Sequence, residues 1–275
     1  MAVLELTGSP TSPRFDEAQC VAAGERLAAE YQNASPFPHI AIDDFIAPDA
    51  LRPIIANFPP REKAVSFSRD QEKLKYQFHP DSLEDDLTYN LFTALNSQPF
   101  LRFLTALTGI EGLIADPYFA GGGLHETLRG GHLGVHADFN RHKKMNVRRR
   151  INVLIYLNED WKDEYGGHLE LWSKDMKTVE RSVAPILGRS VIFNTDLDSY
   201  HGHPDPLTTP DGISRRSIAT YYYTSAQSLA DQPDRTTNFK RRPQSNDKED
   251  FSVKARELVR DLAPPALLRA VRRLK

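Results

Sequence analysis

Residues 130–140 read GGHLGVHADFN, and the order His136-Ala137-Asp138 within them is the most informative pattern in the chain. Successive side chains of a β-strand point to opposite faces, so His136 and Asp138 share a face in an extended segment while Ala137 points away. An imidazole nitrogen and a carboxylate oxygen then form two corners of a metal site. A third ligand from a distant strand would complete a two-histidine, one-carboxylate triad, which binds non-haem Fe(II) and leaves positions open.

The third ligand must come from a later strand, and residues 199–204, SYHGHP, offer two candidates. His201 and His203 share a face if this segment is extended, so strand alternation alone does not choose between them.

The remainder of the chain predicts an α+β, mainly β, fold in which helices come first and last around a central run of strands. Short apolar runs separated by Gly, Asp and Asn predict strands of a barrel or sandwich at 151–157, 168–172, 190–193 and 217–223. Before them, the patterns predict helices at 16–31, 48–57 and 83–107, the last interrupted near Pro99, and a short strand at 39–42.

The domain organisation follows from these elements. We expect a tail and helix at 1–35, one domain at 36–225 with its core at 112–225, a polar linker or surface loop at 226–250, and a basic amphipathic helix at 251–275. That last helix is expected to pack on the barrel, and contact with a membrane surface or partner is the alternative. Segments 61–80 and 121–135, taken as loops that would select the substrate, carry no readable code.

Composition excludes several classes of protein. The 275 residues carry a formal charge of −2, so no global field favours nucleic acid, and the single cysteine, Cys20, excludes an internal disulfide and a cysteine-based zinc site. The N-terminus lacks the features of a signal peptide, and no segment reaches the roughly 18 apolar residues of a membrane helix. We therefore expect a soluble cytoplasmic protein. The basic run 141–150 is expected to be a solvated loop, with attraction of an acidic substrate as the alternative.

Three further stretches carry a family resemblance. They are INVLIYLNEDWKDEYGGHLELW (151–172), GRSVIFNTDLDSYHGHP (188–204) and RRSIATYYYT (215–224). In this order they resemble the core of 2-oxoglutarate/Fe(II) dioxygenases of the prolyl 4-hydroxylase type. The likeness covers about 112–225, and PFPHIAIDDFI (36–46) extends it to residue 36. It implies a double-stranded β-helix barrel, of jelly-roll or cupin-like form, with His136, Asp138 and His201 as the iron ligands.

The resemblance also implies a site for the co-substrate. Arg215 would pair with the distal carboxylate of 2-oxoglutarate, and it is preferred to Arg216 because the isoleucine of the family pattern lies three residues beyond it. A buried carboxylate needs such a partner, and arginine offers a planar fork that stays charged. Tyr156 would donate a hydrogen bond to the same carboxylate, with a plain core aromatic as the alternative. Asn152 shares the face of Tyr156 and is expected to line the pocket.

The implied function is hydroxylation of an unactivated C–H bond with O2, coupled to decarboxylation of 2-oxoglutarate to succinate and CO2. The substrate would be an amino-acid residue in a peptide or protein, or a related small molecule, and ascorbate is implied as an auxiliary reductant. His125 or His132, which precede the metal ligands closely, is a candidate for touching substrate. Two alternatives stay open at this point: a non-oxidative, metal-dependent cupin-like enzyme, and a catalytically silent binding module of the same fold.

Overall fold

A computed structural model describes residues 2–9, 11–84, 86–226 and 234–248. The helices of this part are α1 (Glu17–Gln32), α2 (Pro48–Ala56), α3 (Asp86–Leu95) and α4 (Gln98–Thr108), with short 3-10 turns at Arg61–Lys63, Pro80–Ser82 and Asp163–Tyr165. The strands are β1 (Leu6–Thr7), β2 (Arg14–Phe15), β3 (His39–Ile42), β4 (Val65–Arg69), β5 (Glu72–Phe78), β6 (Ile114–Ala115), β7 (Gly123–Ala137), β8 (Arg141–His142), β9 (Val147–Tyr156), β10 (Leu169–Trp172), β11 (Val179–Val183), β12 (Ser190–Asn194), β13 (His201–His203), β14 (Arg215–Ser225) and β15 (Asn238–Phe239). None of the described helices is long and apolar enough to cross a membrane.

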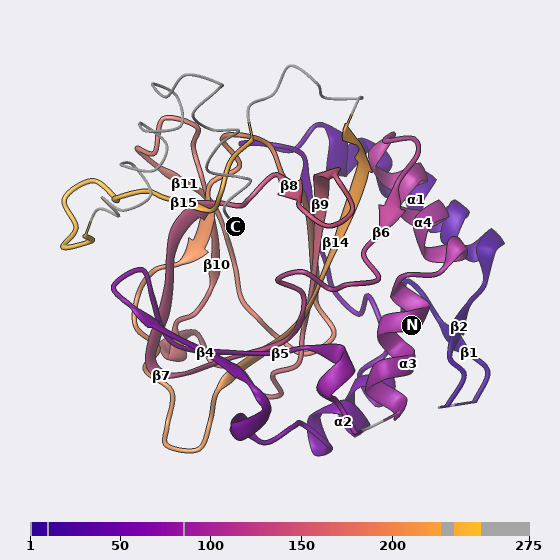
Figure 1. Cartoon of the computed structure of the whole chain (residues 1–275), viewed down its shortest axis with the longest axis horizontal. Helices are drawn as coiled ribbons and strands as arrows, with labels where there is room; N and C mark the ends of the chain where they lie inside the picture. The colour runs from indigo at the N-terminus through magenta and orange to yellow at the C-terminus, as the bar shows by residue number, and fades with distance from the viewer. Residues whose placement is uncertain (1, 10, 85, 227–233, 249–275) are drawn as a thin grey trace, which may run out of the picture.

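The main sheet is antiparallel and curls into a nearly closed barrel, which confirms the predicted fold class (Figure 1). Its strand order is β11-β10-β13-β7-β14-β9-β12-β3, and the β4–β5 hairpin joins through β5 to β7. The long strand β7 belongs to both halves of the barrel. Its first part pairs with β14 and β5, and its last part pairs with β13 and β15.

Both faces of strand β9 are covered. Ile151, Val153 and Ile155 point outward and belong to the same core cluster as the helices. Asn152 and Leu154 point into the barrel and line its cavity. The run INVLIYL, in which Asn152 is the one polar residue, is typical of a strand buried on both sides.

The helices pack on one side of the barrel, next to β9 and β14 (Figure 1). Helix α1 crosses α4 closely, with Gly24 at the contact: a Cβ added there would lie 2.6 Å from the carbonyl oxygen of Phe103. The predicted helix at 83–107 is interrupted as expected, because α3 ends at Leu95 and α4 begins at Gln98, with Pro99 in its first turn.

Several predictions for the segments between these elements are wrong. The 61–80 segment contains a hairpin, β4–β5, and the 121–135 segment lies almost wholly within β7. The basic run 141–150, expected as a solvated loop, contains β8 and the start of β9 and has two buried arginines, Arg148 and Arg149. Within the expected linker 226–250, β15 pairs with the end of β7. The expected helix at 251–275 lies outside the described residues.

The α1–α4 crossing gives a stability prediction. In a helix with free space beside the glycine, a Gly→Ala substitution stabilises by roughly 0.5–1 kcal/mol. In Gly24→Ala the new methyl group would meet the backbone of α4 and the Ala106 side chain. We therefore expect the free energy of unfolding to fall by about 1–3 kcal/mol. Denaturant unfolding measures the change. Ala22→Leu, on the exposed face of the same helix, is the control and should shift stability by less than about 0.5 kcal/mol. Stabilisation by Gly24→Ala would contradict the close crossing.

Candidate metal centre and adjoining cavity

Strands β7 and β13 bring three candidate ligands together. His201 is the register partner of His136, and Asp138 follows directly after β7. One ligand atom from each of His136, Asp138 and His201 lies within 4.8 Å of the others, and all three residues are buried. Asp138 Oδ1 lies 3.6 Å from His136 Nε2, and Asp138 Oδ2 lies 3.5 Å from His201 Nε2.

Hydrogen bonds set the tautomers of both histidines. The Nδ1 atoms of His136 and His201 lie 2.9 Å and 3.0 Å from the carbonyl oxygens of Gly134 and Ser199. A carbonyl only accepts, so each Nδ1 carries the proton and each Nε2 keeps a free lone pair. Burial, aided by the neighbouring His136, lowers the pKa of His201 to about 4, so its ring is neutral near pH 7. Two imidazoles and one carboxylate form a donor set suited to Fe(II).

Asp138 is held as a carboxylate by its surroundings. Burial alone would raise its pKa, but the neighbouring Arg149 charge outweighs burial and holds the pKa well below its usual value. Arg149 Nη2 lies 3.0 Å from Asp138 Oδ2, and the Asn152 amide donates to the same oxygen at 2.7 Å. Asn152 in turn accepts from Arg149 Nε at 2.8 Å. Asn152 therefore lines the cavity, as expected, beside the Asp138 carboxylate.

Sequence reasoning missed Arg149. Its guanidinium stacks on Tyr221, with Cζ 3.4 Å from the ring centroid, and the residue is 2% exposed. Alternation along β9 from Tyr156 would point Arg150 inward. The pairing with β14 skips Arg150, since Tyr222 faces Ile151 and Tyr223 faces Arg149. This bulge turns Arg149 into the barrel, and no signal in the sequence marked it.

The structure separates the two histidines of β13. His201 joins His136 and Asp138, whereas His203 is paired with Leu133 beyond a register shift. His203 also lines the cavity, but its Nδ1 has no hydrogen-bond partner among the described residues. Burial and the Arg215 charge hold the pKa of His203 well below its usual value, so the ring is neutral.

The two candidate arginines point to opposite sides of β14. Arg215 is buried and lines the cavity, and its Nε donates to the Gly167 carbonyl at 2.7 Å. Gly167 has φ +68°, and a Cβ there would lie 3.0 Å from Arg215 Cδ, so glycine permits this approach. Arg216 instead bonds to Glu126 at 3.2 Å and covers the Phe58 ring.

Tyr156 contacts the Arg215 guanidinium without lining the cavity. Its hydroxyl accepts a 3.3 Å hydrogen bond from Arg215 Nη2, and the ring lies 4.9 Å from Arg215 Cζ. Tyr156 is fully buried and is not among the residues that line the cavity. The structure thus places Tyr156 where it orients the guanidinium.

A cavity of about 230 Å³ joins the ligand cluster to Arg215. Its apolar wall includes Leu154, Leu169 and Phe193. His125 also lines it, whereas His132 points away and contacts the Asp70 carbonyl at 3.0 Å. The remaining wall comes from the β4–β5 hairpin, which contributes Phe67, Arg69, Glu72, Lys75 and Gln77. The segment that carried no readable code is thus a wall of the candidate site.

The segment that contains β15 closes the metal end. Phe239 packs on His136 with ring centroids 5.2 Å apart, and Arg235 Nη2 donates to the Asp138 carbonyl at 3.0 Å. These contacts connect residues about 100 positions apart in the sequence, so local patterns could not reveal them.

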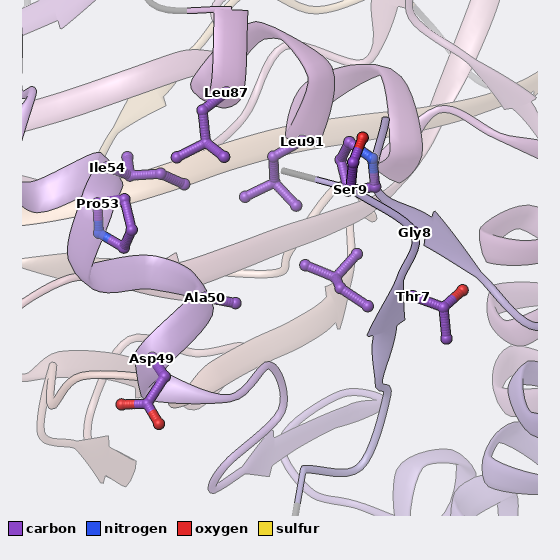
Figure 2. Close-up of a pocket in the computed structure, with 11 residues that line it drawn as sticks. Thr7, Gly8, Ser9, Asp49, Ala50, Pro53, Ile54, Leu87 and Leu91 are labelled. Atoms are coloured by element: carbon purple, nitrogen blue, oxygen red, sulfur yellow. The ribbon is translucent and has the colours of Figure 1, made fainter. Parts of the chain in front are cut away.

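A second cavity, of about 200 Å³, lies away from this cluster (Figure 2). It is a mainly apolar cleft between α2, α3 and the N-terminal segment, with Pro53 and Ile54 facing Leu87 and Leu91. It shares no lining residue with the first cavity and holds no cluster of ligating side chains among the described residues.

Comparison with known proteins agrees with this geometry. Residues 122–223 match the family model of the 2OG-Fe(II) oxygenase superfamily, and no curated protein matches the chain. A prolyl-4-hydroxylase from Pseudomonas putida is 21% identical, with a TM-score of 0.52 over 72% of this chain and 98% of that one. A prolyl hydroxylase from Trichoplax adhaerens, in complex with a hypoxia inducible factor oxygen degradation domain peptide fragment, is 15% identical, with a TM-score of 0.54 over 79% and 96%.

A prolyl 4-hydroxylase from Phytophthora capsici is 17% identical, with a TM-score of 0.50 over 88% of this chain and 75% of that one. These likenesses show that the barrel is the double-stranded β-helix of such enzymes. Residues 122–223, which contain His136, Asp138, His201 and Arg215, are thus similar to the 2OG-Fe(II) oxygenase superfamily.

Proposed function

We propose that this protein is a 2-oxoglutarate- and Fe(II)-dependent hydroxylase. It would insert one oxygen atom of O2 into a substrate C–H bond and place the other in the succinate formed, with CO2 released from 2-oxoglutarate. The substrate would be an amino-acid residue in a peptide or protein, or a related small molecule, in line with the prolyl hydroxylases that share the fold. Ascorbate would serve as an auxiliary reductant.

One observation carries this proposal: a single cavity contains the His136, Asp138, His201 cluster and the buried Arg215. The cluster would hold Fe(II), which supplies the redox chemistry for using O2. Arg215 would hold the distal carboxylate of 2-oxoglutarate with charge-assisted hydrogen bonds. A non-oxidative metal enzyme would have no use for an arginine placed to receive this co-substrate.

The other residues position the reacting groups and keep water out. Asn152 and Arg149 fix the orientation of the Asp138 carboxylate, and Tyr156 fixes that of the Arg215 guanidinium. Leu154, Leu169 and Phe193 provide an apolar wall between the two ends. Low water content strengthens the ionic contacts of the bound co-substrate.

The first prediction tests the reaction and the metal site together. The wild-type protein should bind one Fe(II) and form succinate from 2-oxoglutarate slowly even without a primary substrate. His136→Ala and Asp138→Ala should each abolish both properties, because each removes a ligand. Metal analysis and succinate quantification are the measurements. His132→Ala, which changes a histidine of the same strand that points away from the cavity, is the control. A wild-type protein that binds neither iron nor 2-oxoglutarate would refute the proposed function.

The second prediction uses the adjacent arginines of β14. Arg215→Met should weaken 2-oxoglutarate binding by about 10- to 100-fold, the usual effect of losing hydrogen bonds to a charged group. Arg216→Met is the matched control and should leave this affinity unchanged, because Arg216 faces Glu126. Calorimetric titration of the anaerobic, Mn(II)-loaded protein gives both affinities. Equal losses in the two variants would mean that Arg215 is not the anchor.

The third prediction concerns the orientation of Asp138. Asn152→Ala removes the amide that donates to Asp138 Oδ2, so we expect metal affinity to fall by about 10- to 100-fold. Competition with a fluorescent chelator measures the change. Asn194→Ala, whose side chain accepts from Tyr31 outside the site, should retain wild-type metal affinity. An Asn152→Ala protein with undiminished affinity would show that the hydrogen bond has no role in metal binding.

A further inference from the structure

The cavity wall formed by the β4–β5 hairpin carries an unusual set of charges. In a regular strand, residues three apart face opposite sides of the sheet. The pairing of β5 with β7 shifts register between Lys73 and Lys75, and Leu74 adopts φ +51°. This bulge turns both Glu72 and Lys75 toward the cavity, where Arg69 of β4 joins them.

The hairpin charges do not cancel. Glu72 accepts from Arg69 Nε at 2.9 Å and from Lys75 Nζ at 3.0 Å, so one carboxylate serves two cations. The side chains of Glu72 and Lys75 are only 8% and 13% exposed, so water screens the Lys75 charge weakly, whereas the Arg69 side chain is half exposed. No other carboxylate of the hairpin lines the cavity.

The rest of the cavity offers no anion for this surplus. Among the described lining residues, the carboxylates are Glu72 and Asp138. In the proposed enzyme, Asp138 and one carboxylate of 2-oxoglutarate balance the charge of Fe(II), and Arg215 balances the distal carboxylate. The hairpin cation therefore stays unbalanced after iron and co-substrate are bound, together with Arg149.

Arg149 is poorly placed to bind a further ligand. Its guanidinium already donates to Asn152 and contacts Asp138, and it lies flat against Tyr221. Lys75 differs, because its ammonium carries three donors, and among the described residues it pairs with the Glu72 carboxylate and lies 5.1 Å from the Phe67 ring centroid, which takes no hydrogen bond of the usual kind. His125, which lines the same region, is neutral, because burial and the Lys75 charge lower its pKa to about 3. The cationic group open to a ligand is thus on the hairpin.

Resting on the proposed function, we propose that the primary substrate carries an anionic group, a carboxylate or a phosphate, which binds to Lys75 and Arg69 of the β4–β5 hairpin. When the anionic group of the substrate binds to this wall, the rest of the substrate lies in the cavity that contains His136, Asp138 and His201. The hairpin would thereby select the substrate, while β7, β13 and β14 carry the groups of the reaction.

The test measures binding without turnover. The full-length protein is loaded with Mn(II) and 2-oxoglutarate without oxygen. It is then titrated with N-acetyl derivatives of the neutral amino acids, each as the free carboxylate and as the amide. Paramagnetic broadening of probe protons reports binding close to the metal site. A second arm compares N-acetyl-O-phosphoserine amide with N-acetylserine amide and so distinguishes phosphate from carboxylate recognition.

We expect at least one anionic probe to bind about tenfold more tightly than its neutral partner. Lys75→Gln should abolish this preference, and Lys75→Arg should retain it. Lys73→Gln is the matched control, since Lys73 is an exposed lysine of the same strand that does not line the cavity. Thermal unfolding verifies that each variant is folded.

The outcomes separate the two proposals. Failure of 2-oxoglutarate to bind the Mn(II)-loaded wild type, measured first, would refute the proposed function. If 2-oxoglutarate binds normally, three results would each overturn the inference alone: equal binding of charged and neutral probes, no binding of any anionic probe, or an undiminished preference in Lys75→Gln.

Discussion

A carboxylate inside a protein barrel stays ionised only if nearby charges and hydrogen bonds replace the water it has lost. Asp138 is 8% exposed and meets this condition through Arg149 and Asn152. Without them, burial would favour the protonated acid, which is a poor metal ligand. The inner face of β9 is built around this requirement, because it supplies both the arginine and the asparagine.

The requirement also explains why Arg149 is buried against the cavity. Arg149 stacks on Tyr221 and lies 4.7 Å from the Phe139 ring centroid, so aromatic faces cover the guanidinium on the side away from Asp138. The bulge at Arg150 makes this placement compatible with the apolar alternation of the rest of β9. The bulge in the pairing of β9 with β14 thus also places the charge that keeps Asp138 ionised at the candidate metal site.

Regular alternation was the part of the structure that the sequence could predict. It placed His136 beside Asp138, and it pointed Asn152 and Leu154 into the barrel. Side-chain directions could not be predicted where alternation breaks: at the bulges of β5 and β9, nothing in the residue pattern signals the extra residue. The choice between His201 and His203 needed the pairing of β13 with β7, and the position of Phe239 needed contacts between distant segments.

The partners of each cationic group in the cavity determine what that group can bind. Arg149 contacts a carboxylate within the protein, so its donor groups are used in holding Asp138. Among the described residues, Arg215 bonds to the Tyr156 hydroxyl and the Gly167 carbonyl, both neutral, and burial lowers its pKa. Such a guanidinium is stabilised by an anionic ligand, as the proposed binding of 2-oxoglutarate requires. The hairpin lies between these cases, with two cations for one carboxylate, and its single surplus charge is the one proposed to bind the primary substrate.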